Sequence, residues 1–509
     1  MSVHVPAPTI TIVDTVDLSP PVIIQGGMGV GVSSWQLARK VSQTGQLGVV
    51  SGTALDSVLA RRLQDGDTGG HARRALAHFP AGAVAERVLK RYFLPRGRPA
   101  GTPYRQVPRL MLRSSRASQE LAVVGNFAEV WLAKEGHDGL VGINFLEKVQ
   151  MATPAAAYGA MLAGVDYILV GAGIPTQLPH LLDELSGHRV GQLDVKVDGA
   201  TKPCTCQINP SAVIGDIAEP LKRPKFLAIV SAHVLAAYLA RDDRTRPDGF
   251  IIEGSTAGGH NAPPRGRLTL DADGQPIYGP RDDADLTKIA ALGLPFWLAG
   301  SYGTPDKLRA AIAAGAAGVQ VGTLFALAAE SGLTASLRED VLTNLAADTI
   351  RIHTDPQASP TGFPFKVVSL PGTLSEDSTY AERPRLCDMS YLRVPYVRPD
   401  GTVGYRCPAE PVDEYIRKGG ALADTIGRKC LCNSLTANIG LGQNRLDGYV
   451  EQPMVTLGAD LDGLRELLAH FPDGWTATEA VGWLLDAERV SQRFSMHAVF
   501  HCDRNGPTP

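Results

Sequence analysis

Residues 295–326 read PFWLAGSYGTPDKLRAAIAAGAAGVQVGTLFA, a pattern of two short apolar runs on either side of a helical stretch. Pro295–Ala299 and Gly318–Gly322 are near-continuous apolar runs, which are typical of strands buried on both faces of a parallel sheet. Between them, Thr304-Pro305 opens a helical pattern that Gly315 ends. This stretch therefore predicts a strand–helix–strand unit with two parallel strands.

The same unit recurs along the chain. Six further apolar runs are each followed by small or polar residues, and several by a helical pattern: Pro21–Gln25, Leu47–Ser51, Val141–Phe145, Tyr167–Gly171, Phe226–Val230 and Gly249–Glu253. Eight strand–helix units predict an α/β protein with a (β/α)8 fold, the TIM barrel. Without residues 54–140, the span from Pro21 to Thr349 has roughly the ~250 residues of a typical barrel.

Two regions fall outside this regular pattern. Residues 54–140 form a long insertion after strand 2, charged and mixed in composition, which we expect to be helical and to act as a lid over the chemical face of the barrel. Past residue 350 the segments become short and rich in Pro and Gly. We therefore predict a barrel domain over 1–349. An irregular, cysteine-containing appendage is predicted over 350–509, with helices near 461–494.

The composition limits the classes of partner. The chain has 49 Lys plus Arg and 52 Asp plus Glu, a net charge of -3. This balance argues against nucleic acid or a polybasic membrane contact. Hydrophobic residues make up 44% and charged residues 20%, as in a globular protein with a large core.

The sequence gives no reason to expect a membrane or secreted protein. The uncharged run Ala310–Ala329 has the length of a spanning helix, but Gly315 and Gly318 divide it. The first residues show neither a basic n-region nor a long apolar h-region, so a cytoplasmic protein is expected.

The cysteines favour buried reduced thiols over a metal site. There are seven: Cys204, Cys206, Cys387, Cys407, Cys430, Cys432 and Cys502. An odd number fits a reducing compartment. Zinc sites favour paired ligands two to four residues apart, and the spacing from Cys387 to Cys432 matches this poorly. We therefore expect no metal.

Chemistry in such a barrel belongs at the C-terminal ends of the strands. Strand 1 ends in Gln25-Gly-Gly-Met28-Gly29, where glycines let a flat ligand approach the backbone. One alternative is a dinucleotide fingerprint, since Gly29-Val-Gly31 precedes a helix. It lacks the third glycine, and no acidic residue follows strand 2. Another alternative is that these are ordinary turn glycines.

The loops after strands 7 and 8 predict a phosphate site. They read Ala299-Gly-Ser-Tyr-Gly-Thr304 and Gly322-Thr323. Small residues expose backbone N–H groups, and a helix beginning at Thr304 adds the positive end of its dipole. Barrels often bind phosphate with these two loops.

Three polar residues follow other strands. His260 lies in the glycine-rich loop after strand 6, where an imidazole can exchange a proton near neutral pH. Asn144 ends strand 3 and can hydrogen-bond a heterocycle. Lys148 is placed to hold an anion, although a solvated lysine explains it equally.

Together these motifs resemble the nitronate monooxygenase (2-nitropropane dioxygenase) family over about residues 20–335. The shared elements are Gln25-Gly-Gly-Met-Gly with Ser33, Gly142-Ile-Asn144-Phe, Gly258-Gly-His260, Ala299-Gly-Ser-Tyr-Gly303 and Gly318-Val-Gln-Val-Gly322-Thr323. The resemblance implies bound FMN and a catalytic histidine at His260. It implies cofactor contacts from Gln25, Gly27, Met28, Asn144, Gly258, Gly259, Gly300, Ser301, Gly303, Gly322 and Thr323.

The resemblance implies an FMN-dependent oxidoreductase that uses O2 to convert nitronates or nitroalkanes to carbonyl compounds and nitrite. Since a neutral nitroalkane must first lose a carbon-bound proton, we expect His260 to be the base. The segment Ala358–Phe365 is more similar to flavin enoyl reductases of polyketide and polyunsaturated fatty-acid synthesis. The alternatives are therefore an NAD(P)H-dependent enoyl or quinone reductase, and a non-catalytic partner in a biosynthetic complex. A homo-oligomer is compatible with all of them.

Overall fold

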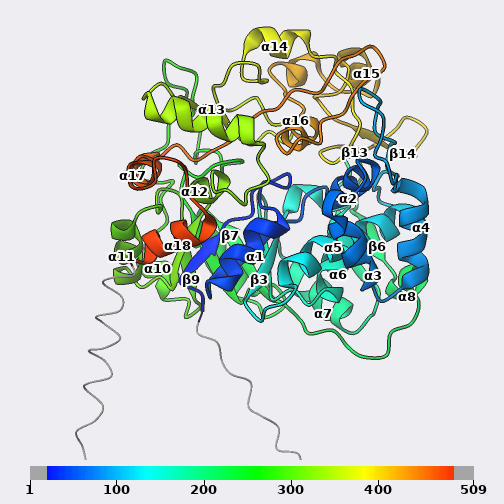
Figure 1. Ribbon diagram of the computed structural model, residues 1–509, viewed down its shortest axis with the longest axis horizontal. Coiled ribbons are helices and arrows are strands. Elements are labelled where there is room, and N and C mark those ends of the chain that lie inside the picture. Colours follow the sequence, from blue (N-terminus) through cyan, green and yellow to red (C-terminus); the bar gives the residue numbers. More distant parts are fainter. Residues whose placement is uncertain (1–19, 487–509) are drawn as a thin grey trace, which may run out of the picture.

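Eight parallel strands form a closed barrel in this computed structural model, which describes residues 20–486 (Figure 1). The order around the barrel is β1-β10-β9-β8-β7-β4-β3-β2. Its strands are β1 (Ile23–Gln25), β2 (Leu47–Ser51), β3 (Val141–Leu146), β4 (Tyr167–Gly171), β7 (Lys225–Val230), β8 (Gly249–Glu253), β9 (Phe296–Ala299) and β10 (Gly318–Val321). All eight predicted strands and the (β/α)8 fold are confirmed.

The apolar runs form strands because both of their faces are buried. Inward-facing side chains fill the barrel, and the remaining ones pack under the helices. Trp297 on β9 is buried within the barrel, and its indole N–H donates to the carbonyl oxygen of Pro21 at 2.7 Å. The interior of the barrel is therefore a packed core.

Helices surround the barrel, and side-chain caps set the start of several of them, with Asp285 capping α10. The Oγ of Ser34 caps α1, and Thr304 caps α11 as predicted. The helices along the barrel are α1 (Trp35–Gln43), α6 (Thr153–Leu162), α7 (Leu178–Ser186), α8 (Pro210–Ile214), α9 (His233–Ala240), α10 (Leu286–Ala290), α11 (Pro305–Ala313), α12 (Thr323–Ala326) and α13 (Ala335–Ala346), with the short η2 (Glu147–Val149). A hairpin of β5 (Gly191–Val195) and β6 (Cys204–Ile208) lies between β4 and β7. Among the described residues, no helix is long and apolar enough to cross a membrane.

The insertion 54–140 is helical, and its expected role as a lid stays a prediction. It forms α2 (Leu55–Gln64), η1 (Thr68–Gly70), α3 (His71–Ala77), α4 (Gly82–Tyr92) and α5 (Arg116–Lys134). Helix α5 packs against α1 and α6, the place of the barrel helix between β2 and β3. The approach to α6 is close: a Cβ on Gly159 would lie 2.1 Å from the carbonyl oxygen of Val123. None of these described residues lines the main cavity defined below.

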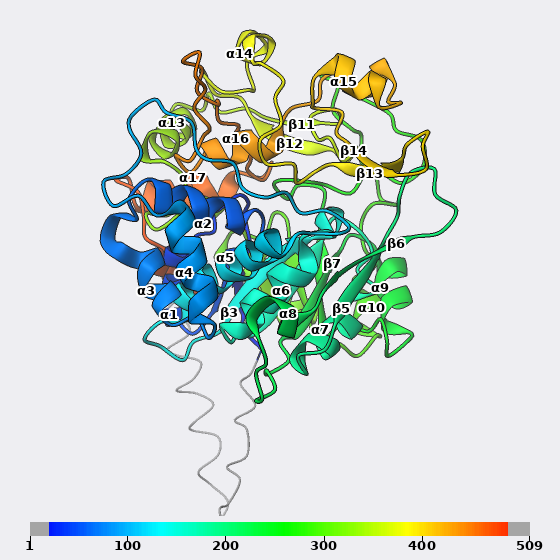
Figure 2. The same cartoon turned by 90° about the vertical axis from the view of Figure 1, so that its right-hand side faces the viewer.

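Residues 350–486, here called the C-terminal segment, lie over the end of the barrel (Figure 2). They form two antiparallel pairs and several short helices: β11 (Ile352–Asp355) with β12 (Phe365–Val368), α14 (Asp377–Glu382), β13 (Val394–Val397) with β14 (Val403–Arg406), α15 (Val412–Arg417), η3 (Leu422–Thr425), α16 (Leu431–Ala437), α17 (Asp462–His470) and α18 (Ala477–Leu485). The helical region expected near 461–494 is thus two helices, and its residues 487–494 lie outside the described part of the chain.

The expected domain boundary at residue 349 does not separate two units. Helix α18 packs between α1 and α11 and so completes the ring of helices around the barrel. Just before it, the buried Trp475 donates its indole N–H to the carbonyl oxygen of Leu324 at 2.9 Å. The backbone N–H of Ala477 donates to the carboxylate of Glu330 at 2.8 Å. The C-terminal segment is therefore part of the barrel's own packing.

Replacing Trp475 with Ala tests this packing. Trp475 is 3% exposed, and we expect Trp475→Ala to lower the free energy of unfolding by ~3–5 kcal/mol, because a large buried side chain leaves a cavity. Trp475→Phe should cost less. Trp483→Ala, at a partly buried site on α18, is the control and should also cost less. Urea unfolding measures all three, and equal curves for wild type and Trp475→Ala would contradict the packing described.

Candidate active site

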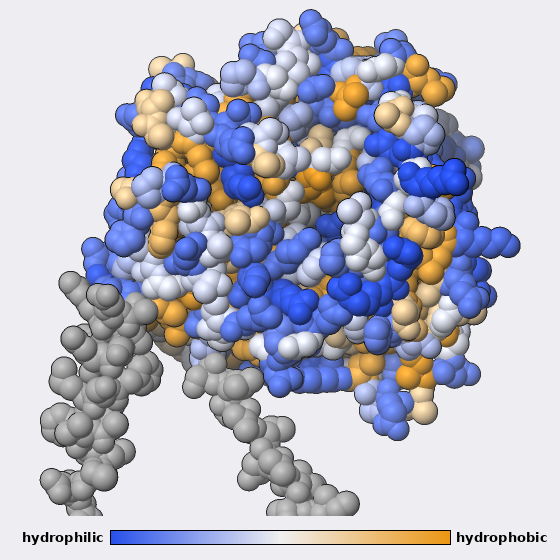
Figure 3. Space-filling model, viewed as in Figure 1, coloured by the Kyte–Doolittle hydropathy of each residue, from blue (hydrophilic) through white to orange (hydrophobic). Residues whose placement is uncertain are grey.

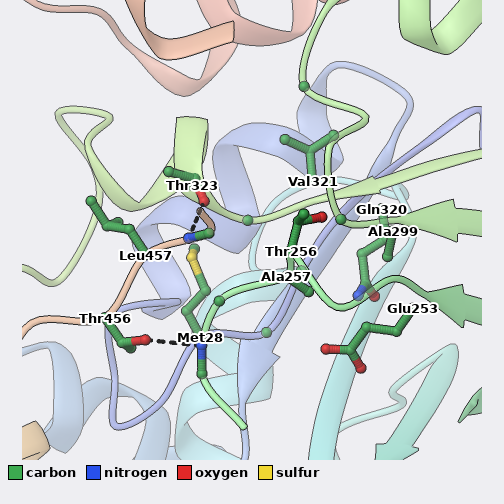
Figure 4. Close-up of a pocket in the computed structure, with 18 of the residues that line it drawn as sticks. Met28, Glu253, Thr256, Ala257, Ala299, Gln320, Val321, Thr323, Thr456 and Leu457 are labelled. Atoms are coloured by element: carbon green, nitrogen blue, oxygen red, sulfur yellow. Dashed lines mark hydrogen bonds between the residues drawn. The ribbon is translucent and has the colours of Figure 1, made fainter. Parts of the chain in front are cut away.

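A cavity of about 250 Å³ lies at the C-terminal ends of the barrel strands. We call it the main cavity. Its walls come from the loops after β1, β3, β8, β9 and β10, and from residues 456–464 of the C-terminal segment (Figure 4). Gly27, Met28, Asn144, Gly258, Gly259, His260, Gly300, Ser301, Gly303, Gly322 and Thr323 all line it. The structure therefore brings together residues that the sequence spreads over about 300 positions.

Gln25 is the one predicted site residue that lies behind the cavity. Its fully buried amide donates to Ser33 Oγ at 2.8 Å and accepts from the backbone N–H of Val49 at 3.0 Å. Ser33 Oγ also accepts from the N–H of Met28 at 2.8 Å. Gln25 thus holds the shape of the strand-1 loop, and the glycines and Met28 form the surface that faces a ligand.

The strand-1 loop passes so close to β3 that it needs glycine. A Cβ on Gly27 would lie 2.1 Å from the side-chain oxygen of Asn144. At Gly27 the loop therefore brings its backbone to the cavity, and Met28 adds a side chain beside it.

Three buried polar atoms on the cavity wall have no hydrogen-bond partner within the described chain: Asn144 Oδ1, Gln320 Oε1 and Ser51 Oγ. An unpaired buried polar group costs about 1–3 kcal/mol, so such groups mark a place where a polar ligand pairs with them. Our sequence analysis missed Gln320. Its signal is a polar side chain inside the otherwise apolar strand β10.

The loop after β9 is shaped to bind an anion. Gly300 and Ser301 have positive φ angles of 81° and 60°, and Ser301 Oγ donates to Thr256 Oγ1 at 2.8 Å. Within residues 20–486, the backbone N–H groups of Ser301, Tyr302 and Gly303 donate no hydrogen bond. Free N–H groups beside the start of α11 attract negative charge.

Charged side chains of both signs surround that loop. The cation is Lys307, and the carboxylates of Asp460 and Asp462 lie at the same end of the cavity. Thr323 Oγ1 accepts from the N–H of Gly458 at 3.0 Å, which ties the loop after β10 to the C-terminal segment (Figure 4). Backbone N–H groups and Lys307 are thus the available anion donors here.

His260 is held by the C-terminal segment. Its Nε2 lies 2.7 Å from Ser359 Oγ, and its ring packs edge-on against Phe365 with centroids 4.9 Å apart. Burial, with the positive charge of Lys148 as a smaller cause, lowers the pKa of His260 from 6.5 to about 4. The expectation of a base poised near neutrality is therefore wrong, because the imidazole is desolvated next to a cation and stays neutral.

Sequence analysis did not assign a role to Glu253, the last residue of β8. Its carboxyl lines the main cavity, and burial raises its pKa to about 7 against the opposing charge of Lys366. Lys366 itself is buried, with a pKa lowered to about 8, and donates to Thr354 Oγ1 at 2.7 Å. The sequence does contain a pattern that could have identified Glu253 as a site residue, because it is a carboxyl group at the C-terminal end of an apolar barrel strand.

A second cavity of about 240 Å³ adjoins the main one. The two share Ala172, Ile229, Glu253 and His260 as wall residues. The second cavity is also lined by the apolar side chains of Ile174, Leu235 and Phe363 and by the charged side chains of Arg265 and Asp282, so its wall is mixed in polarity. A substrate at the shared wall can therefore extend an apolar part away from the main cavity.

Four of the cysteines gather in the C-terminal segment. Cys387, Cys407, Cys430 and Cys432 surround a small space, and all four are free thiols. Burial raises the pKa of the Cys432 thiol to about 11. In the described part of the chain, no group of three or more His, Cys, Asp or Glu side chains is placed to hold a metal ion.

The loops after β8, β9 and β10 lie in the part of the chain that matches a known protein family. Residues 205–361 match the family model described as Nitronate monooxygenase. The resemblance to the nitronate monooxygenase family is confirmed. The matched region contains β7 to β10, His260 and both loops of the anion end. It supports an oxidoreductase.

Three solved structures are similar to the chain. FabK from Thermotoga maritima has 16% identity and a TM-score of 0.45, covering 94% of this chain and 97% of that one. The nitroalkane oxidase from Streptomyces ansochromogenes has 16% identity and a TM-score of 0.41, with 94% and 99% covered. The enoyl reductase domain of MlnA from Bacillus amyloliquefaciens has 12% identity and a TM-score of 0.46, with 94% and 97% covered. No curated protein matches the chain.

The low pKa of His260 makes stability depend on pH. The unfolded chain takes up a proton on this histidine as the pH falls below 6.5, and the folded chain does so only near pH 4. This group therefore lowers the free energy of unfolding as the pH drops from 6.5 to 4, by at most about 3 kcal/mol. Glu253 and Glu147, whose pKa values are raised to about 7, act in the opposite sense.

The difference between wild type and His260→Gln isolates the histidine. We expect the variant to lose less stability than wild type between pH 6.5 and 4, measured by urea unfolding at each pH. His78→Gln replaces an exposed histidine and is the matched control. Parallel curves for wild type and His260→Gln would show that burial does not hold His260 neutral.

Proposed function

We propose that this chain is an FMN-dependent oxidoreductase. The observation that supports this most directly is the arrangement of the main cavity. Unpartnered amide oxygens of Asn144 and Gln320 lie on its wall, and the free N–H groups of Ser301 to Gly303 lie at its anion end. A flat heterocycle with one phosphate satisfies both sets. The match to the nitronate monooxygenase family supports the same cofactor class.

The residues that would hold FMN are those of the strand ends. Asn144 and Gln320 would pair with polar edges of the ring, and the backbone of Gly27 would lie against it. Residues 456–464 cover the cavity and exclude water. When bound, a flavin supplies the electron transfer that amino-acid side chains cannot.

The leading reaction is oxidation of a nitronate by O2 to a carbonyl compound and nitrite. A nitronate is an anion, and two lysines add positive charge near the wall that the two cavities share. The charge of Lys148 acts on the pKa of His260, and the charge of Lys366 acts on the pKa of Glu253. Both favour a negatively charged substrate. A neutral His260 can hydrogen-bond such a substrate without proton transfer.

One observation favours reduction of enoyl thioesters as the second candidate. The segment Ala358–Phe365, which resembles flavin enoyl reductases, contacts the site directly through Ser359 and Phe365 on His260. The apolar part of the second cavity's wall, with Ile174, Leu235 and Phe363, also suits an acyl chain.

The bound cofactor and its reductant test the proposal. Chromatography of the cofactor released by denaturation should give FMN, and recovery of FAD would contradict the mononucleotide. An anaerobic titration then separates the reactions by flavin absorbance. Bleaching by ethyl nitronate, with nitrite formed once O2 is admitted, supports the oxidase. Bleaching by NADPH alone supports the enoyl reductase. A purified protein that neither contains nor takes up flavin would favour a non-catalytic role.

Asn144→Leu tests the role of the unpartnered amide. Because the amide oxygen has no partner in the protein itself, its removal should leave the stability of the cofactor-free protein nearly unchanged. It should weaken FMN binding by about 1–3 kcal/mol, or ~10–100-fold in Kd. Fluorescence quenching of added FMN measures this, with Asn344→Leu, at a half-buried position outside the main cavity, as control. Unchanged FMN affinity would remove Asn144 from the cofactor site.

A further inference from the structure

Glu253 has an unusual position among the buried carboxyl groups. It ends β8 and borders both cavities, and its carboxyl group makes no hydrogen bond or ion pair with any residue in the 20–486 range, although its backbone pairs with β9. Figure 4 shows its carboxyl pointing from the strand into the cavity, on the side of Gln320. By contrast, Glu147 accepts from Gln150 at 2.6 Å, and Glu451 pairs with Arg383. Buried carboxylates are normally paired, so Glu253 is placed to meet a ligand.

The surroundings of Glu253 let it change protonation state near neutral pH. Burial raises its pKa to about 7. The charge that opposes this comes from Lys366 on β12. The flanking strands β7 and β9 contribute apolar side chains at this end, and His260 on the following loop is neutral. Both the acid and the carboxylate forms are thus populated at pH 7, which suits a group that exchanges protons.

We propose that Glu253 is the general base that removes the carbon-bound proton of a neutral nitroalkane in the main cavity. The Glu253 carboxylate takes the hydrogen from the carbon next to the nitro group. The C–H bond breaks, its electron pair moves into the nitro group to give the nitronate, and an O–H bond forms on Glu253. No oxidant takes part in this step. The inference rests on the proposed function, and it assigns to Glu253 the deprotonation step that a neutral nitroalkane needs and a nitronate does not.

His260 is less suited to this step. Its Nε2 is engaged with Ser359 at 2.7 Å, and Lys148 disfavours the positive charge that it would gain as a base. Glu253 gains no unfavourable charge, since protonation neutralises its carboxylate. The two residues line the same wall, so a substrate there contacts both.

Proton exchange without oxidation tests Glu253. The holoenzyme is incubated anaerobically with nitroethane in D2O, and loss of the α-proton signal is followed by NMR. Oxidation of ethyl nitronate is measured separately as O2 uptake. We expect Glu253→Gln to slow the enzyme-dependent exchange by ~10²-fold or more, and to affect exchange at least about tenfold more than nitronate oxidation. Glu147→Gln is the matched control: it removes another buried carboxyl of raised pKa that lies outside the main cavity, and should change neither rate.

The outcomes separate this inference from the proposed function. Wild-type exchange should rise with pH through about 7, and this profile tests the assignment even if Glu253→Gln does not fold. A profile centred near 4 would instead identify His260. Unchanged exchange in a folded Glu253→Gln, equal losses in both assays, or no exchange by wild type would overturn the role of Glu253. Wild-type exchange without nitronate oxidation would overturn the proposed oxidase and leave Glu253 as the base.

Discussion

Three hydrogen bonds join residues 456–459 to the loops at the end of the barrel, and the shape of the main cavity depends on them. The N–H of Gly259 donates to Thr456 Oγ1 at 2.9 Å, that of Gly458 to Thr323 Oγ1 at 3.0 Å, and that of Ala459 to the carbonyl oxygen of Thr256 at 2.8 Å. The contact is tight, since a Cβ on Gly258 would lie 2.9 Å from the backbone nitrogen of Gly458. A glycine there serves the packing of two backbones, not only the approach of a ligand.

The C-terminal segment also contributes groups that act on the titratable side chains of the site. Hydrophilic residues cover much of the surface shown in Figure 3, with hydrophobic residues in separate patches. Inside, burial shifts the pKa values of His260 and Glu253 in opposite directions, to about 4 and about 7, and the C-terminal segment contacts His260 through Ser359 and Phe365. One cause explains both shifts, because desolvation disfavours the charged form of either group. The same segment supplies Lys366 and Ser359, which act on these two side chains.

Local patterns in the sequence were enough to predict the barrel and much of its site. Each strand is an apolar run followed by its own turn. Because the C-terminal ends of the parallel strands lie on one face of the barrel, Asn144, His260 and the glycine loops that follow these ends surround one cavity. Long-range packing could not be predicted in this way. Nothing near Gln25 shows that its amide bonds Ser33 instead of a ligand, and the partner of His260 lies 99 residues away. The pKa of His260 depends on burial by residues that are distant in the sequence. The residues around His260 therefore predicted its position in the site but not its protonation state.

The position of α18 in the helix ring bears on how the chain is made. Strand β10 ends at Val321, whereas α18 begins at Ala477. A ribosome adding ~5–20 residues per second takes roughly 10–30 s to cover that interval. During this time the apolar side of α1 that faces α18 has no cover from its own chain. The newly made barrel therefore passes through a stage in which this apolar surface of α1 can bind another unfinished chain or a chaperone. Rapid synthesis of the last residues shortens that stage and so reduces aggregation.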